Sequence, residues 1–457
     1  LLMGVLMAQK GNPAQAEPWL SRALQINPRH AYAQLNRGNV MQELGRHDEA
    51  LANYDQAIAL QPDLEDAHYN RGRVLHLSEH LDTALASYER ALALNPGHVE
   101  AHNNRGMVLA SKCKWVEAIS AYDQALKLNP RYHEAWNHRG LALQAIGNFK
   151  AAILSFEKAI ALQETYAEAH NNRATVLRED LKKNAEALAA AERALALDPK
   201  DADAHLNRAH ALAALKRYPE AIAGYRSALD AGGNRELLSY YLSALGAEAT
   251  PATAPRRYVE SLFDQYAPRF DESLNALNYR VPEQLYEAVA SLDAVARRDI
   301  ADLGCGTGLC APFFDRIAGT LVGVDVSEAM LAKAAARGLY DDLVRSDLVE
   351  FLNGRPVAFD LLIAADVFIY VGALESVFAA ARVSLRPGGQ LAFSVEVCEG
   401  DGFIVRPSRR FAHSLPYLAA LATGHGFNTE LTISIAVRQE EGQDIPGYIV
   451  VLTRDKS

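Results

Sequence analysis

The chain has 457 residues, of which 49% are hydrophobic and 22% are charged, and its formal net charge at pH 7 is −10. This length predicts at least two domains, and the apolar fraction is sufficient for buried cores. The mild acidic excess, without a basic stripe, argues against a nucleic-acid-binding protein and against an anionic membrane surface as a partner.

The cysteines and the apolar start favour a cytoplasmic protein. Cys113, Cys305, Cys310 and Cys398 form no C-x-x-C pair and no zinc-ligand spacing, so we expect reduced thiols and no metal site. Residues 1–8 are apolar but too few to span a membrane, and no basic flank precedes them. The chain begins with Leu rather than Met, which is compatible with a natural start further upstream.

Residues 1–246 repeat with the 34-residue period that is typical of tetratricopeptide helix pairs. A small residue recurs at Gly4, Gly38, Gly72, Gly106, Gly140, Ala174 and Ala209. An aromatic residue recurs at Tyr54, Tyr88, Tyr122, Phe156 and Tyr225. We expect the small residue to let paired helices approach closely and the aromatic residue to fill the gap between neighbouring pairs. The predicted repeats are 1–28, 29–62, 63–96, 97–130, 131–164, 165–199 and 200–233, followed by a capping helix at 236–246.

An amide ladder runs along the first helix of the repeats. Its members are Asn36, Asn70, Asn104, Asn172 and Asn207, with His138 in the remaining position. Amides in such a row can hydrogen-bond an extended peptide backbone, and the row resembles the asparagine ladder in the repeats of O-GlcNAc transferase. We therefore predict a protein or peptide partner on the concave face. The alternative is that these side chains cap or bridge neighbouring helices.

Two further columns accompany the amides. An arginine follows each ladder position, at Arg37, Arg71, Arg105, Arg139, Arg173 and Arg208, and we expect it to bridge helix pairs. A ring with a polar nitrogen stands two residues before the ladder position, at His68, His102, Trp136, His170 and His205. These histidines lie one repeat apart rather than four residues apart, so a metal site is not expected.

Residues 247–256 are rich in Ala, Pro and Thr and are predicted to be a linker to a second domain, 257–457. Short apolar runs then alternate with amphipathic stretches, which predicts an α/β sheet of the Rossmann-like type. The expected strands are Asp299–Leu303, Thr320–Asp325, Leu343–Ser346, Phe359–Ala364 and Gln390–Glu396, with a terminal antiparallel pair at Phe427–Arg438 and Tyr448–Thr453. Helices are expected at 309–318, 327–337 and 373–385.

A glycine-rich loop, D-L-G-C-G-T-G at 302–308, follows the first expected strand and precedes a helix. Glycines let the backbone pass close to a ligand, and a helix N-terminus presents free N–H groups. Alone the loop is ambiguous, because residues 306–311 also satisfy a loose dinucleotide pattern, G-x-G-x-x-A. Asp325 ends the second strand, where a carboxylate can bind ribose hydroxyls, and Asp347 follows the third, where it can accept from an adenine amino group.

The ordered segments D-L-G-C-G-T-G, V-D-V-S, S-D-L, D-V-F and L-R-P-G-G resemble the class I S-adenosylmethionine-dependent methyltransferases over residues 258–453. The segment 258–282 resembles the lid that precedes the first strand in bacterial methyltransferases with tetratricopeptide repeats. It is more distantly similar to the lid of biotin-pathway and ubiquinone-pathway methyltransferases. The resemblance implies a seven-stranded, mostly parallel sheet, S-adenosyl-L-methionine as cofactor, and methyl transfer to an unidentified acceptor.

The resemblance also implies roles for matching residues. Those expected at the cofactor are Asp302, Gly304, Cys305, Gly306, Gly308, Asp325, Val326, Met330, Asp347, Leu348, Tyr266, Phe270 and Tyr279. Among these, Val326 and Met330 would sandwich the adenine, and the three aromatic residues would shield the sulfonium. The alternatives are that Val326 and Met330 belong to the core and that Asp302 braces the loop.

Methyl transfer needs a general base only when the nucleophile arrives protonated. The candidates are Asp366, Tyr370 and His413, with Glu396 also considered, and each has pocket lining as its alternative role. Three functions stay open: a protein methyltransferase served by its repeats, a small-molecule methyltransferase whose repeats serve assembly, and a scaffold that binds cofactor without turnover.

Overall fold

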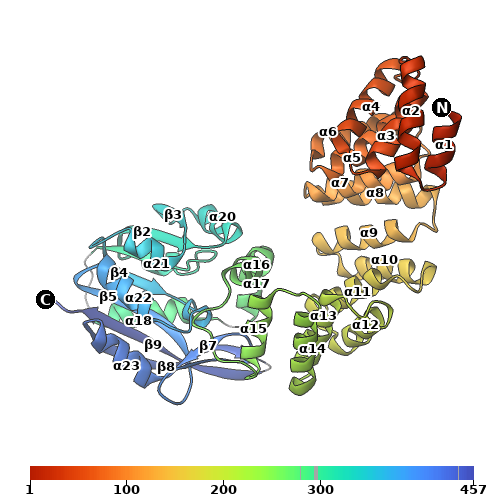
Figure 1. Ribbon diagram of the computed structural model, residues 1–457. Coiled ribbons are helices and arrows are strands. Elements are labelled where there is room, and N and C mark those ends of the chain that lie inside the picture. The colour runs from red at the N-terminus through yellow and green to blue at the C-terminus, as the bar shows by residue number, and fades with distance from the viewer. Residues whose placement is uncertain (278, 293–296, 441, 457) are drawn as a thin grey trace. The chain divides into compact units, whose positions relative to one another are not determined.

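The computed structural model describes residues 1–277, 279–292, 297–440 and 442–456 (Figure 1). The chain divides into two compact units, Leu1–Gly224 and Tyr225–Ser457. This division lies inside a helix, Tyr218–Asp230, upstream of the linker that the composition predicts at 247–256. The predicted boundaries at 246 and 257 therefore stay a prediction, and the two units are described separately below.

Residues 1–230, all of which the structure describes, form seven helical pairs that follow the predicted repeats. The helices are α1 Leu2–Gln9, α2 Pro13–Ile26, α3 Ala31–Glu43, α4 His47–Leu60, α5 Glu65–Leu77, α6 Leu81–Leu94, α7 Val99–Ser111, α8 Trp115–Leu128, α9 His133–Ala145, α10 Phe149–Leu162, α11 Ala167–Glu179, α12 Asn184–Leu197, α13 Ala202–Ala214 and α14 Tyr218–Asp230.

The recurring small and aromatic residues meet within each pair. A Cβ added to Gly38 on α3 would lie 2.5 Å from the ring of Tyr54 on α4, and one added to Gly106 on α7 would lie 2.5 Å from the ring of Tyr122 on α8. Both rings are buried. The aromatic residue thus packs on its own partner helix. It also belongs to a core cluster with residues of the following pair, as Tyr54 does with Val74 on α5, which agrees with the predicted place between neighbouring pairs.

The second unit contains helices and a single mixed sheet. Its helices are α15 Arg235–Ala244, α16 Arg256–Tyr266, η1 Ala267–Arg269, α17 Phe270–Ala276, α18 Val281–Leu292, α19 Ala311–Phe314, α20 Glu328–Arg337, α21 Leu348–Asn353, η2 Phe368–Tyr370, α22 Glu375–Ser384 and α23 Leu415–Gly424. Its strands are β1 Arg298–Leu303, β2 Ala318–Asp325, β3 Asp342–Arg345, β4 Phe359–Ala364, β5 Leu385–Val397, β6 Phe403–Val405, β7 Phe411–His413, β8 Phe427–Glu440 and β9 Gln443–Arg454.

The sheet has the order β3-β2-β1-β4-β5-β7-β6, and β9 pairs antiparallel with both β5 and β8. Strands β1 to β5 pair in parallel, as the sequence predicted. Over the described residues the sheet contains nine strands instead of the expected seven. The additional pair is the short hairpin of β6 and β7, whose three-residue strands are too brief to give a pattern.

Helices cover both faces of this sheet (Figure 1). Alternate residues of β4 divide between the two sides, as strand geometry requires. Leu361 and Ile363 pack in a cluster with residues of α18 and α19, whereas Leu362 and Ala364 pack with residues of α21, α22 and α23. The buried parallel strands bring the carboxyl ends of β1, β2 and β4 to one edge, where ligands bind in open α/β sheets.

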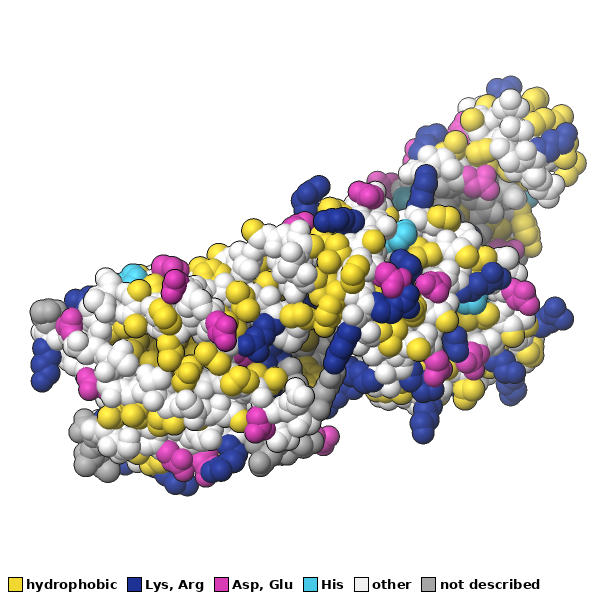
Figure 2. Space-filling model, turned by 90° about the horizontal axis from the view of Figure 1, so that it is seen from below, with side chains coloured by type: hydrophobic (Ala, Val, Ile, Leu, Met, Phe, Trp, Pro, Cys, Tyr) yellow, Lys and Arg dark blue, Asp and Glu magenta, His cyan; other side chains and the backbone are white. Residues whose placement is uncertain are grey.

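None of the helices in the described stretches is both long and apolar enough to cross a membrane. On the face shown in Figure 2, Lys and Arg side chains are interspersed with Asp and Glu. This mixture of charges on that face agrees with the absence of a basic stripe in the sequence.

Candidate active site

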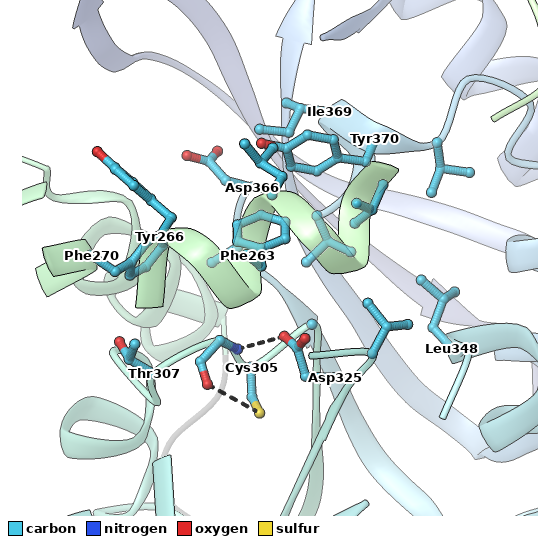
Figure 3. Close-up of a pocket in the computed structure, with 18 of the residues that line it drawn as sticks. Phe263, Tyr266, Phe270, Cys305, Thr307, Asp325, Leu348, Asp366, Ile369 and Tyr370 are labelled. Atoms are coloured by element: carbon cyan, nitrogen blue, oxygen red, sulfur yellow. Dashed lines mark hydrogen bonds between the residues drawn. The ribbon is translucent and has the colours of Figure 1, made fainter. Parts of the chain in front are cut away.

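A cavity of about 580 Å³ lies at the carboxyl ends of the central strands of the second unit. The loops after β1, β2 and β4 form one part of its wall, and the segment α16–α17 forms another. Phe263, Tyr266 and Phe270 come from that segment, and Asp366 and Tyr370 follow β4 (Figure 3). The cavity therefore gathers most of the residues that the sequence assigned to the cofactor.

The glycine loop shapes the floor of this cavity. Gly304 has a φ of +63°, and a Cβ there would lie 2.7 Å from Cγ2 of Val367. Gly306 donates its N–H to Oδ2 of Asp325 at 2.9 Å. Cys305 lines the cavity with both glycines, but Gly308 is not among the lining residues and instead turns the chain with a φ of +83°.

Asp325 ends β2 and faces the cavity. Its two oxygens accept hydrogen bonds from the backbone N–H groups of Gly306 and Ser327, both at 2.9 Å. These bonds fix the carboxylate in one orientation. Burial nevertheless raises the pKa of Asp325 above its ordinary value. The site thus holds an oriented acceptor beside the glycine loop.

Asp302 is almost fully buried and is braced by a tyrosine. The hydroxyl of Tyr340 donates to Oδ2 of Asp302 at 2.6 Å, which supports the loop-bracing role that the sequence left open. Asp302 also lines the cavity. Burial raises the pKa of Asp302 to about 7, so its charge changes near neutral pH.

The residues expected around an adenine lie partly in the cavity. Val326, Asp347 and Leu348 line it. Asp347 also caps α21, because its Oδ1 accepts from the N–H groups of Val349 and Glu350. Met330 is fully buried in the interior and is not a lining residue, so its predicted place at the adenine is corrected to the core.

Two aspartates fasten the segment α16–α17 to the loops that follow β1 and β2. The hydroxyl of Ser327 donates to Oδ1 of Asp264 at 2.5 Å. Asp271 accepts from Oγ1 of Thr307 at 2.5 Å and from Nη2 of Arg337 at 2.6 Å. The segment therefore forms a lid whose aromatic side chains lie over the glycine loop, and these carboxylates hold it there. The sequence singled out the lid but gave these aspartates no role.

Asp366 and Tyr370, two of the candidates for a general base, line the cavity after β4. Asp366 has a φ of +56°, and its Oδ1 accepts from the hydroxyl of Ser394 at 2.9 Å. Tyr279 lies beside Asp366, whose negative charge raises the pKa of the tyrosine further above the value that burial gives it. Burial raises the pKa of both Asp366 and Tyr370. Tyr370 is therefore a proton donor at neutral pH rather than a base.

His413 is not part of the cavity, which corrects its assignment as a catalytic candidate. It is fully buried on β7, and its Nε2 lies 3.0 Å from the carbonyl oxygens of Val371 and Gly372. Burial lowers the pKa of His413 to about 4, so the ring is neutral and Nε2 donates to these carbonyls. Glu396 is also buried and outside the cavity lining, where it pairs with Arg438 and Arg406.

Three arginines line the cavity without having been predicted, and one of them, Arg256, begins α16. Arg410 immediately precedes β7, and Arg438 lies near the end of β8. Arg410 and Arg438 belong to no recognisable sequence pattern. Their only signal is a cluster of positive charge at 406–410, and its proximity to Asp366 depends on the sheet order rather than on any local motif.

The amide ladder of the repeats bridges neighbouring helices. Asn172 donates from Nδ2 to Oδ1 of Asn137, one repeat earlier, at 3.0 Å, whereas Asn36 donates to the carbonyl oxygen of Tyr32 in its own helix at 2.6 Å. Asn70 and Asn104 likewise reach the preceding repeat, at Asn39 and Tyr69. An amide has a second N–H and an oxygen, so these bonds leave capacity for a peptide.

Asn207 differs from the other members of the ladder. Its side chain is buried, its Nδ2 donates to Asn171 and Thr175, and its Oδ1 accepts from Arg178. Both N–H groups and the oxygen are thus engaged inside the array. Its assignment to peptide binding is corrected to a structural role.

The arginine column joins consecutive helices, as expected. Arg71 on α5 donates to Asp55 on α4 at 2.7 Å and to Ser87 on α6 at 2.8 Å. The ring column closes the turns between pairs, because His102 and its equivalents bond a carbonyl oxygen six residues earlier, here that of Pro96 at 3.0 Å. No group of metal-ligating side chains occurs among the described residues.

Comparisons with known proteins agree with both units. A methyltransferase domain model matches residues 301–393, and tetratricopeptide repeat models match 43–79, 65–98, 99–132, 133–166 and 172–236. The methyltransferase GfsG of Streptomyces halstedii is 31% identical over 193 residues, which are 38% of this chain and 68% of that enzyme. A ubiquinone biosynthesis O-methyltransferase of Hahella chejuensis is 30% identical, over 22% of this chain and 44% of its own length.

The repeat part is similar to solved structures. A tetratricopeptide repeat protein from Parabacteroides merdae is 22% identical, with a TM-score of 0.43, and the match covers 52% of this chain and 93% of that protein. The family matches agree with the cavity at the glycine loop and with the repeating helix pairs. The chain belongs to the class I methyltransferases and carries an N-terminal array of tetratricopeptide repeats.

Proposed function

We propose that this protein transfers a methyl group from S-adenosyl-L-methionine to an acceptor, and that its repeats recruit a protein partner or substrate. The arrangement at the glycine loop supports the first part. Gly304 has no side chain where a Cβ would meet Val367, so the backbone itself forms the wall of the cavity. Asp302, Asp325 and Asp347 line the same end, and this acidic surround suits a ligand that carries positive charge and hydroxyl groups.

The residues around the cavity have distinct tasks in this proposal. When bound, S-adenosylmethionine supplies an electrophilic methyl group on a sulfonium. Asp325 accepts hydrogen bonds from the ribose hydroxyls, Val326 and Leu348 contact the adenine, and Asp347 accepts from its amino group. Phe263, Tyr266, Phe270 and Tyr279 exclude water from the reacting atoms and hold them in line, which is the main need of this displacement.

Calorimetric titration of the full chain with S-adenosylmethionine and with S-adenosylhomocysteine tests this assignment. Asp325→Ala is expected to weaken the binding of both ligands at least tenfold, because it removes the oriented hydrogen-bond acceptor at the end of β2. Asp342→Asn is the matched control, since Asp342, on β3, is an exposed carboxylate that pairs with Arg355. No binding by the unchanged chain would refute the proposed function. Binding without turnover in any extract would instead support a cofactor-binding scaffold.

The recruiting role of the repeats rests on the half-buried amides along the first helices. Asn70, Asn104 and Asn172 are engaged on one side by the preceding repeat and retain hydrogen-bonding capacity on the amide. Residues one repeat apart stack along the array, so Leu141 on α9 continues the line of Asn39 and Thr175. A partner bound along these helices would contact that line.

A photo-crosslinking amino acid separates the two faces of the array. At Leu141, which is 38% exposed on a first helix, it is expected to capture a protein that is then methylated. At Leu154, which is 62% exposed on the second helix α10, it serves as the control and should give no such product. Equal capture from both positions would contradict recruitment along the first helices and favour a role of the repeats in assembly.

A further inference from the structure

The chain between α15 and α16 is hydrogen-bonded to the second unit at both of its ends. Residues 249–254, here called the strap, lie in the segment whose composition predicts a linker. At the upstream end, the carbonyl oxygen of Ala249 lies 2.8 Å from the buried hydroxyl of Ser243 on α15, which is equally close to the carbonyl oxygen of Ser239. At the downstream end, Ala254 is buried. The strap therefore has a fixed course along the second unit.

The downstream half of the strap pairs with the loop that follows η2. The carbonyl oxygen of Ala252 accepts from the N–H groups of Gly372 at 2.9 Å and Ala373 at 2.7 Å. The N–H group of Ala254 donates to the carbonyl oxygen of Tyr370 at 3.0 Å. Three backbone hydrogen bonds thus join the strap to the loop that carries a candidate residue of the site.

Thr253 adds a side chain to this pairing. Its hydroxyl donates to the carbonyl oxygen of Tyr370 at 3.2 Å, and its backbone forms an antiparallel bridge with Val371. Thr253 and Ala254 line the cavity, and so do Tyr370 and Val371. The strap consequently forms part of the cavity wall and also holds the neighbouring part in place.

The competing explanation is that the rest of the unit already fixes this loop. The N–H groups of Tyr370 and Val371 bond to carbonyl oxygens at the start of η2. On the side of the hairpin, His413 donates to the carbonyl oxygens of Val371 and Gly372. These bonds leave the carbonyl oxygen of Tyr370 and the N–H groups of Gly372 and Ala373 to the strap. Backbone groups that lose such partners are costly to leave unpaired, so the loop would loosen without the strap.

The wall held by the strap lies away from the glycine loop. In Figure 3, Ile369 and Tyr370 are on the side of the cavity opposite Cys305 and Thr307. The ring centroids of Tyr370 and Phe263 lie 5.3 Å apart, so this wall meets the lid. The strap, the loop after η2 and the lid therefore close the cavity together.

We propose that residues 252–254 are positioning residues for the methyl acceptor, because they hold Tyr370 and Val371 as the wall against which it lies. This inference rests on the proposed methyl transfer. The displacement requires aligned and water-free reacting atoms, so a loosened wall slows it. The glycine loop, which lies opposite, keeps its contacts with the cofactor. Disrupting the strap should therefore lower the rate of transfer more than the affinity for cofactor.

The test compares two Ala→Pro variants of the full chain. Ala254→Pro removes the N–H group that bonds to Tyr370. Ala249→Pro is the matched control in the same strap, because Ala249 is exposed and its N–H group makes no hydrogen bond within the described structure. Each variant is incubated with an extract of the encoding organism and increasing amounts of S-adenosylmethionine tritiated on the methyl group. The affinity for S-adenosylhomocysteine is measured by calorimetry.

Ala254→Pro is expected to lower the maximal rate of label incorporation by about tenfold or more. The KM for S-adenosylmethionine and the affinity for S-adenosylhomocysteine should change by less than about threefold, which corresponds to less than half of the free energy of a tenfold change. Ala249→Pro should alter none of these values by more than that amount. Thr253→Val is a milder second variant, expected to lower the rate by about threefold through loss of one hydroxyl hydrogen bond. Thr253→Ser keeps the hydroxyl and should lose less.

Hydrogen exchange gives a readout that does not depend on activity. The amides of Gly372 and Ala373 should exchange about tenfold faster or more in Ala254→Pro than in the unchanged chain. Unchanged exchange would overturn the holding of the loop by the strap, and faster exchange with unchanged transfer would overturn its role for the acceptor. Equal losses of transfer and cofactor affinity would also overturn that role. If the unchanged chain binds no cofactor or gives no labelled product, the proposed function itself fails, whatever the exchange at these amides.

Discussion

The carboxylate of Asp271 holds the lid against the glycine loop, and Asp271→Asn tests how much this contact contributes. Asp271 accepts from Thr307 and from Arg337, and Nε of Arg337 also donates to the carbonyl oxygen of Thr307. Asparagine keeps the size of the side chain but loses the charge and one acceptor. The substitution therefore weakens the closed lid without removing its aromatic residues.

The magnitude follows from the exposure of the two partners. The side chains of Asp271 and Arg337 are 36% and 27% exposed. A hydrogen bond to a charged group contributes about 1.5–3 kcal/mol when buried, and an exposed ion pair about 0.2–1 kcal/mol. A value of about 1–2 kcal/mol is expected between these limits. At about 1.4 kcal/mol for each factor of ten, affinity for S-adenosylhomocysteine should fall by about 5- to 30-fold.

Calorimetric titration of the full chain measures this loss. Glu260→Gln is the control on the same lid, because Glu260 pairs with Arg256 inside α16 at 2.9 Å. Its i,i+4 pair is worth about 0.3–0.5 kcal/mol, so affinity should change by little more than about twofold. If Asp271→Asn binds as tightly as the unchanged chain, or if both variants lose affinity equally, the lid is not held by this carboxylate.

Other positions give sharp expectations of their own. Gly304→Ala should weaken the binding of S-adenosylhomocysteine at least tenfold, because the added Cβ would meet Val367 and the φ of this residue is positive. Adding Val367→Ala should restore only part of the affinity, because the cost of the positive φ, about 1–2 kcal/mol, persists. Gly106→Ala should lower the free energy of unfolding of the repeats by about 1–3 kcal/mol in urea titrations, because the added Cβ would meet the ring of Tyr122. Gly97→Ala is the control and should change that free energy by less than about 0.5 kcal/mol, because its Cβ would meet only the Asn95 side chain at 3.4 Å. The pKa of Asp302 is raised to about 7, so this carboxyl stabilises the folded state at low pH and loses that contribution as pH rises from about 4 through about 7. The melting temperature of the unchanged chain relative to that of Asp302→Asn should therefore fall over this interval. A difference in melting temperature that stays constant with pH would contradict the prediction.

The repeats could be predicted almost completely because each position recurs. Seven copies of one pattern average out the ambiguity of any single helix, and the 34-residue period alone is enough to define the helix pairs. The full set of contacts of each aromatic ring was harder to predict. The period of Tyr54 is the same whether its ring packs on Gly38, on the following pair or on both, and the structure shows both contacts.

The part of the cavity at the glycine loop was predictable for a different reason. Its residues follow the ends of successive parallel strands, and those ends meet at one edge in any doubly wound sheet. The places of Arg410 and Arg438 in the cavity wall were not predictable, because these residues come from a short hairpin and a terminal strand whose positions depend on pairing with β5 and β9. Met330 and His413 show the opposite error, because residue type and spacing suggested contact with a ligand, whereas both side chains are buried and neither lines the cavity.

Helix α15 follows the last repeat along the chain, yet its tyrosines belong to the packing of the second unit. The hydroxyl of Tyr240 donates to the carbonyl oxygen of Arg409 at 2.5 Å, and its ring lies 5.4 Å from that of Tyr258. Glu236, on the same helix, lines the cavity. A protein shortened to begin at the predicted linker would lack Tyr240, uncover the ring of Tyr258 and lose Glu236 from the cavity rim. Activity lost by such truncation would then report damage to the catalytic unit and not the absence of the repeats.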